Sequence, residues 1–136
     1  MISRLGHEES LHDRQSLTLR LVAAGWEPPA AAKKAALFDR VLAALEHRTP
    51  VRPEARPAVF SVPGRIEVLG KHTDYAGGRS MVAATECGFC LVAVPRNDAK
   101  VVVIDAARND AVEFSLHADL VPTVGHWSNY PMTVAR

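Results

Sequence analysis

The chain has 136 residues, of which 48% are hydrophobic and 23% charged, and its formal net charge is +1. This length fits one domain of ordinary size, and the near-neutral balance argues against nucleic acid or an anionic membrane as a partner. No apolar run approaches the roughly 18 residues of a membrane span. The residues before Ser10 lack the apolar core of a secretory signal, so we expect a cytoplasmic protein.

The first part of the chain predicts two helices. Residues 10–24 form the first, with Ser10 and Asp13 spaced as a capping box and a glycine and two prolines after its end. Residues 30–47 form the second. Its apolar residues recur at the spacing of a buried stripe (Phe38, Val41, Leu42 and Leu45), opposite a charged face (Lys33, Lys34 and Arg40). Prolines at 50, 53 and 57 then predict an extended linker.

Beyond the linker the apolar pattern changes to a period of two, which predicts strands. We expect short strands at 58–62, 65–69, 80–85, 88–94, 100–105 and 112–116, paired as antiparallel hairpins. A last helix is expected to start near Ser128, its candidate cap, and to be cut at Arg136. The predicted fold class is therefore α+β, a mostly antiparallel sheet with helices packed on one side, apparently truncated.

The only cysteines are Cys87 and Cys90, three positions apart in Cys-Gly-Phe-Cys. This spacing occurs in redox pairs and in half of a zinc site. A zinc site needs about four ligands, and no second Cys/His cluster follows at the usual spacing. Residues three apart on a strand also point to opposite faces. We expect two partly buried free thiols and no metal site.

Residues 63–78 concentrate polar chemistry in one loop. A short strand leads into five consecutive side chains that carry a cation, an imidazole, a hydroxyl, a carboxylate and a phenol: Lys71, His72, Thr73, Asp74 and Tyr75. Gly77 and Gly78 close the loop and are expected to supply positive φ angles. Such a set can hydrogen-bond a polyol from several directions, which points to a sugar-like ligand.

The stretch 63–75 resembles the galactokinase signature of the GHMP small-molecule kinases. Eight positions match it in order: Pro63, Gly64, Arg65, Gly70, His72, Thr73, Asp74 and Tyr75. The resemblance extends over residues 36–136. It implies that residues 31–136 are part of a GHMP-kinase N-terminal domain whose sugar-binding motif is 63–78. Residues 1–30 show no particular resemblance to the family, and we expect them to form an N-terminal helical extension. It also implies transfer of the ATP γ-phosphoryl group to the anomeric hydroxyl of a sugar, with Mg²⁺.

The resemblance implies a role for each motif residue. Arg65 is the expected catalytic group, a transition-state stabiliser, and the alternative is an ion pair with Glu67. Asp74 is expected to accept hydrogen bonds from sugar hydroxyls; the alternative is an Asx-turn. His72 is expected to line the sugar site. Lys71, Thr73 and Tyr75 complete the substrate-binding set, although Thr73 and Tyr75 are equally well explained as loop scaffolding.

Two positions depart from the galactokinase pattern. Glu67 stands where galactokinases usually carry Asn, and Lys71 where they carry a Glu that accepts a hydrogen bond from the C6 hydroxyl of the sugar. A lysine ammonium has donors only. One hypothesis is that the C6 group is itself an acceptor, as in a uronic acid such as galacturonate. The alternative is that Glu67 and Lys71 form an ion pair and the substrate stays galactose.

The glycine- and serine-rich loop that cradles ATP phosphates is not found in the sequence, and we expect no cofactor-binding residue in this chain. ATP and Mg²⁺ are expected to bind mainly to a C-terminal part and second domain that the chain lacks. We therefore expect part of a longer sugar 1-kinase that is inactive by itself. The alternative is a non-catalytic sugar-binding or sensor module. Either reading implies a small-molecule sugar as the partner.

Overall fold

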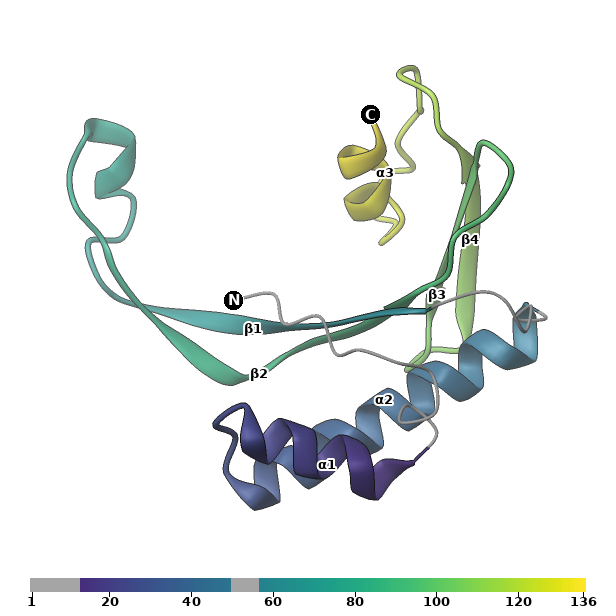
Figure 1. Ribbon diagram of the computed structural model, residues 1–136. Helices are drawn as coiled ribbons and strands as arrows, with labels where there is room; N and C mark the ends of the chain where they lie inside the picture. Colours follow the sequence, from purple (N-terminus) through teal and green to yellow (C-terminus); the bar gives the residue numbers. More distant parts are fainter. Residues whose placement is uncertain (1–12, 50–56) are drawn as a thin grey trace.

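The computed structural model describes residues 13–49 and 57–136 (Figure 1). In chain order the elements are α1 (Arg14–Ala23), α2 (Pro28–Arg48), β1 (Ala58–Leu69), the 3₁₀ helix η2 (Thr73–Ala76), β2 (Met81–Ala93), β3 (Lys100–Asp105), β4 (Asp110–Ser115) and α3 (Asn129–Ala135). Both strand pairs are antiparallel. The α+β class predicted from the sequence is confirmed.

The start of α1 is set by Asp13, whose side chain accepts a hydrogen bond from the backbone N–H of Gln15 at 3.0 Å. This is an ordinary N-cap, which satisfies one of the unpaired donors of the first turn. The predicted cap Ser10 lies outside the described residues. Leu17 and Leu21 lie on one face of α1 and are buried, as their spacing predicted.

Helix α2 begins two residues earlier than predicted, because Pro28 and Pro29 form its first turn instead of ending the previous segment. Proline is tolerated there since the N–H groups of the first turn have no helical partner. Phe38 and Leu42 are buried as expected. The expected charged face is wrong at one position, because Lys34 is only 3% exposed.

Strands β1 and β2 form one long antiparallel hairpin in place of the four short strands that the sequence predicted. The pairing runs through Pro63 and Gly64, where the register shifts by a bulge in β2. At that point the two backbones touch: a Cβ on Gly88 would lie 2.1 Å from the Val62 carbonyl oxygen. The predicted breaks are therefore a bulge inside continuous strands, which a glycine on each strand permits.

The hydrophobic core lies between the helices and the near half of this hairpin. Leu17, Phe38 and Val59 are fully buried there, and Val92 opposite Val59 is 8% exposed. Beyond the bulge the hairpin leaves the helices, and residues 65–69 and 81–84 are all exposed. Figure 1 shows α1 and α2 on one side of the near half, and η2 at the far end of the hairpin.

Strands β3 and β4 form a second two-stranded sheet, so the strands do not join one continuous sheet. α3 lies beside this sheet (Figure 1). Just before α3, Trp127 donates from its indole Nε1 to Asp110 Oδ2 at 2.8 Å. Ser128 stands at the predicted cap position, but its hydroxyl makes no capping bond and lies 2.8 Å from Nδ1 of His126.

Two further sequence predictions concern single features. Both cysteines carry free thiols; Cys90 is half-buried as expected, whereas Cys87 is exposed. Cys87 is one of the two unpaired residues in the bulge of β2. None of the helices in the described ranges is long and apolar enough to cross a membrane.

Candidate functional site

The motif loop connects β1 to β2 at the far tip of the hairpin and is closed by its own hydrogen bonds. The carbonyl oxygen of Gly70 accepts from the Thr73 N–H (3.1 Å), the Thr73 hydroxyl (2.8 Å) and the Ser80 hydroxyl (2.7 Å). The N–H of Gly78 donates to the Thr73 carbonyl at 2.8 Å. The loop therefore has a defined shape without any contact to the core.

Three glycines make this closure possible. Gly70 has φ +83°, and a Cβ there would lie 2.4 Å from the Arg79 carbonyl oxygen. Gly77 has φ +74°, as predicted. The same prediction for Gly78 is wrong: its φ is ordinary, and it must be glycine because a Cβ would lie 2.8 Å from the Thr73 carbonyl oxygen. Gly78 is therefore required because of the close approach of the Thr73 backbone and not because of a positive φ.

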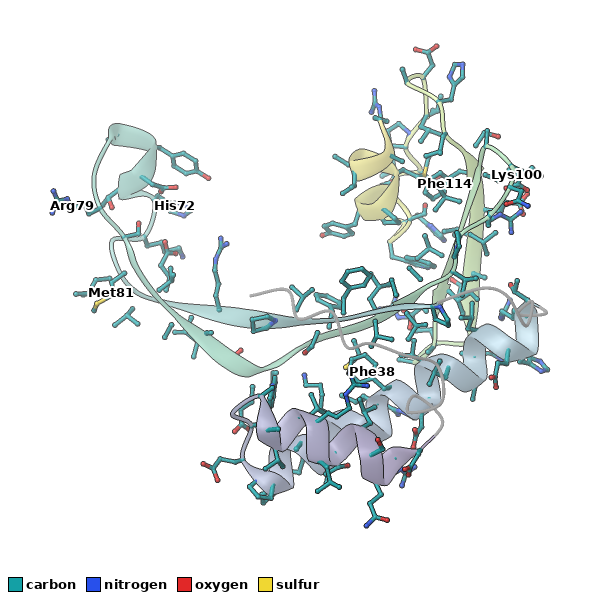
Figure 2. The ribbon with its side chains drawn as sticks, viewed as in Figure 1. Phe38, His72, Arg79, Met81, Lys100 and Phe114 are labelled. Atoms are coloured by element: carbon teal, nitrogen blue, oxygen red, sulfur yellow. The ribbon has the colours of Figure 1, made fainter. Side chains whose placement is uncertain are left out.

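His72 adopts φ +63°, in the left-handed region that non-glycine residues rarely occupy. Its ring stacks on that of Tyr75, with centroids 5.6 Å apart and planes 12° from parallel. Tyr75 is 84% exposed, so the pair presents a flat aromatic surface to solvent. Figure 2 shows His72 and Arg79 on opposite sides of the loop.

Asp74 lies in η2, and its side chain is exposed. Its carboxylate has no hydrogen bond to any described residue, so the Asx-turn that the sequence left open is not formed. Both carboxylate oxygens are available as acceptors. Thr73 differs, because its hydroxyl donates to backbone carbonyls inside the loop, at 2.8 Å to Gly70 and 3.1 Å to Arg79. Thr73 closes the loop, and Asp74 offers acceptors to solvent.

Arg65 lies on β1 opposite Ala84 and is exposed. Within the described ranges it forms no ion pair with Glu67, and Glu67 forms none with Lys71, so neither sequence-based pairing is present. Five residues of strand, at about 3.3 Å each, separate Arg65 from Gly70, which is roughly 16 Å. The structure therefore groups Lys71 to Tyr75 in one loop and places Arg65 further down the strand.

Sequence reasoning missed two residues that shape the loop. The motif match gives Gly70 no conformational role, and the sequence pattern places Ser80 only in a strand. Ser80 directly follows Arg79 at the end of the loop, where a hydroxyl can reach back to the opening carbonyl. A small hydroxyl residue ten positions after the opening glycine was the available signal.

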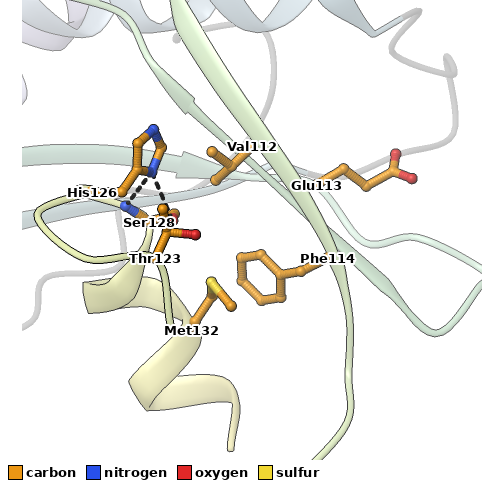
Figure 3. Close-up of a pocket in the computed structure, with 7 residues that line it drawn as sticks. All are labelled: Val112, Glu113, Phe114, Thr123, His126, Ser128 and Met132. Carbon is orange, nitrogen blue, oxygen red and sulfur yellow. Dashed lines mark hydrogen bonds between the residues drawn. The ribbon is translucent and has the colours of Figure 1, made fainter. Parts of the chain in front are cut away.

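The described part of the chain also has a cavity of about 330 Å³ between β4 and α3 (Figure 3). None of the predicted site residues lines it. The lining combines apolar and polar side chains: Val112, Glu113, Phe114, Thr123, His126, Ser128 and Met132. The Nδ1 atom of His126 accepts from the Ser128 N–H at 3.3 Å and lies 2.8 Å from the Ser128 hydroxyl. These bonds hold the start of α3 in place.

Residues 43–95 match the family model for the galactokinase galactose-binding signature, which spans β1, the motif loop and β2. The chain is 41% identical over 76 residues to a galactokinase of Staphylococcus carnosus and 36% identical over 83 residues to one of Enterococcus faecalis. This part of the chain is similar to the galactose-binding segment of galactokinases.

The alignments with curated galactokinases cover more than half of this chain but only a small part of each relative. The Staphylococcus protein aligns with 54% of this chain and 20% of its own length, and the Enterococcus protein with 60% and 21%. The chain thus spans about a fifth of the length of these relatives. No solved structure matches the chain.

Two features of the described residues bear on whether they could hold Mg²⁺ or the triphosphate of ATP. No three His, Cys, Asp or Glu side chains gather into a possible metal site in the described ranges. Helix α2 opens with Pro28 and Pro29, which have no N–H to offer a phosphate. No nucleotide or metal chemistry is therefore assigned to these residues.

Proposed function

We propose that this chain supplies the sugar-recognition part of a galactokinase-type kinase, which transfers the γ-phosphoryl group of ATP to the anomeric hydroxyl of galactose or a related sugar. The observation that carries the proposal is the motif loop, closed by its own hydrogen bonds, with the unpartnered carboxylate of Asp74 inside the galactose-binding signature. A cytoplasmic location belongs to the same proposal, since ATP is a cytoplasmic substrate.

In this proposal Asp74 binds two neighbouring ring hydroxyls. A carboxylate accepts shorter and stronger hydrogen bonds than a neutral group, and no described residue competes for its oxygens. His72 offers a ring nitrogen to the same sugar. Its stack on Tyr75 fixes the orientation of the imidazole. Thr73 contributes by holding the loop closed rather than by donating to the sugar.

Arg65 is the proposed transition-state stabiliser. Its guanidinium is always ionised and planar, and it is not neutralised by Glu67 in the described structure. Charge stabilisation of this kind is the main protein contribution to phosphoryl transfer. Because the described residues do not fit ATP or Mg²⁺, the proposal assigns both to polypeptide corresponding to the rest of a galactokinase. It follows that the 136-residue chain alone binds sugar without turnover.

The identity of the sugar is the finer part of the proposal. Lys71 lies beside His72 at the start of the loop, with no ion pair to Glu67, so its ammonium is available to a ligand acceptor. An ammonium there favours a carboxylate at C6, and we propose a uronic acid such as galacturonate. Isothermal titration of the 136-residue chain with galactose and with galacturonate tests this choice.

The expected result is tighter binding of galacturonate by the wild type, at low salt, by up to about fivefold, the value of one exposed charge pair. Lys71→Glu should reverse the preference toward galactose. Lys33→Glu, an equal charge change on exposed α2 surface, should leave it unaltered. A wild type that prefers galactose overturns the uronate assignment and leaves the galactokinase-type proposal in place.

The second candidate is a non-catalytic sugar-binding module, favoured by the absence of a phosphate-binding loop in the described residues. Assay of ATP turnover with the bound sugar, with this chain alone and with it joined to the remaining length of a galactokinase, separates the two. Turnover by the joined protein that Arg65→Ala abolishes supports the kinase. Unchanged sugar binding with no turnover in either form supports the module.

A further inference from the structure

The bulge of β2 is the last place where the helices hold the long hairpin. Before it, Val59 and Val92 are buried against α2. After it, residues 65–69 and 81–84 are exposed, and no element of the described structure covers them. The direction of the far half, which carries Arg65 and the motif loop, is therefore decided at the bulge.

One side chain reaches the bulge from α2. The ammonium of Lys34 donates to the backbone carbonyl of Glu86, the first of the two unpaired residues of the bulge, at 3.1 Å. The ammonium also lies 5.0 Å from the centre of the Trp26 ring, in a cation–π contact. Lys34 is 3% exposed, and a lysine is buried to this degree only where its charge has such partners.

The carbonyl that Lys34 uses is free because of the bulge. A residue in a bulge leaves the regular ladder, so its backbone oxygen needs another donor. The bulge has two other fixed points: the Thr85 hydroxyl donates to the Cys87 carbonyl at 2.9 Å, and Gly88 lies against the Val62 carbonyl. Those contacts are internal to the hairpin. Among the hydrogen bonds of the described residues, Lys34 alone joins the bulge to the helical layer.

The half-buried thiol of Cys90 lies near the same ammonium. Burial raises the pKa of the Cys90 thiol, and the nearby charge of Lys34 opposes part of that rise. Cys90 is on β2 two residues after Gly88, opposite Ser61. The Lys34 ammonium therefore lies against β2, near both the Glu86 carbonyl and the Cys90 thiol. The helical spacing had predicted that it would lie in solvent.

From this geometry we infer that Lys34 is a positioning residue, which acts through the Glu86 carbonyl to hold the far half of the hairpin, and thereby the sugar site, in one direction relative to the core. The inference rests on the proposed function for its effect on sugar binding. Its structural part, the orientation of the hairpin, does not. Lys34 touches no substrate, and its contribution is to keep Arg65 and the motif loop in a fixed frame.

Four forms of the 136-residue chain test this: wild type, Lys34→Met, Lys34→Arg and Lys33→Met. Methionine keeps the apolar stem and removes the donor, arginine restores a donor, and Lys33 is the exposed neighbour on α2. NMR residual dipolar couplings measure the orientation of residues 65–69 relative to α2. Titration measures the affinity for galactose or galacturonate, whichever the wild type binds more tightly.

We expect wild type, Lys34→Arg and Lys33→Met to fit a single rigid orientation. Lys34→Met should show reduced couplings in the far half alone, with unchanged couplings in α1 and α2, and bind sugar about tenfold more weakly. Where Lys34→Met does not fold, Lys34→Gln, too short to reach the carbonyl, takes its place. If Lys34→Met (or Lys34→Gln) keeps the wild-type couplings in residues 65–69, the inference is wrong. If the wild type binds neither sugar, the proposed function is contradicted, and the residual dipolar couplings alone then test the inference about Lys34.

Discussion

Replacement of Asp74 by alanine separates a ligand-binding role from a structural one. In the structure the carboxylate has no hydrogen bond to a described residue, and the loop is closed by Gly70, Thr73 and Ser80. Removal of the carboxylate therefore breaks no contact of the folded state. We expect the free energy of unfolding to change by less than about 0.5 kcal/mol, the range of ordinary surface substitutions.

The effect on sugar binding should be much larger. A hydrogen bond to a charged group contributes about 1.5–3 kcal/mol, so loss of the carboxylate should weaken binding by about tenfold to a hundredfold or more. Asp74→Asn keeps one acceptor oxygen and should fall between the wild type and alanine. Asp119→Ala is the matched control, since Asp119 is an 87% exposed carboxylate remote from the motif in sequence.

Calorimetric titration with galactose and galacturonate, together with urea unfolding of the same samples, measures both quantities. The reasoning fails if Asp74→Ala lowers the stability by about 1 kcal/mol and leaves the sugar affinity unchanged, because that pattern belongs to a turn residue. It also fails if Asp119→Ala weakens sugar binding as much as Asp74→Ala does.

Two further predictions concern the fold. Gly88→Ala should destabilise the protein by about 3 kcal/mol, because its Cβ would lie 2.1 Å from the Val62 carbonyl oxygen. Gly125→Ala is the control: no atom lies within 4 Å of its Cβ, so it should cost only the roughly 1 kcal/mol that its positive φ implies. Urea unfolding measures both losses, and equal losses would refute the clash at Gly88. The indole N–H of Trp127, followed by the N–H of Ala111, lowers the pKa of Asp110, so this contact stabilises the protein above the unfolded pKa and is lost as the pH falls through the folded value. Trp127→Phe should therefore reduce the stability lost between neutral and acid pH, measured by thermal unfolding at each pH; an unchanged pH dependence would contradict it.

Local patterns predicted most of the elements. The spacing of Phe38 and Leu42 identified the buried face of α2, and the period-two pattern after residue 57 identified strands whose positions agree closely with the structure. These features depend on residues three or four apart in a helix and two apart in a strand, so a single sequence carries them. The predicted breaks in β1 and β2 were wrong because Pro63, Gly64 and Gly88 mark turns and bulges equally well.

The burial of Lys34 could not be predicted from such local patterns. A lysine opposite an apolar stripe predicts an exposed side chain, yet a bulge carbonyl and the Trp26 ring surround its ammonium. Both partners come from other elements, and neither is visible from the helical spacing. The same limit applies to Gly78, whose small size is required by the Thr73 carbonyl and not by its own φ.

The sequence by itself determined the chemistry of the candidate site, because Lys71 to Tyr75 are adjacent in the chain and need no long-range contact to come together. It also placed them in a galactokinase-like motif before any geometry was known. Only the tertiary structure decided that the Asp74 carboxylate is unpartnered, that Arg65 and Glu67 are not paired, and that Lys34 is buried and donates to the Glu86 carbonyl. These properties follow from how separate segments meet in space, and bulges and buried charges leave no periodic trace in a sequence.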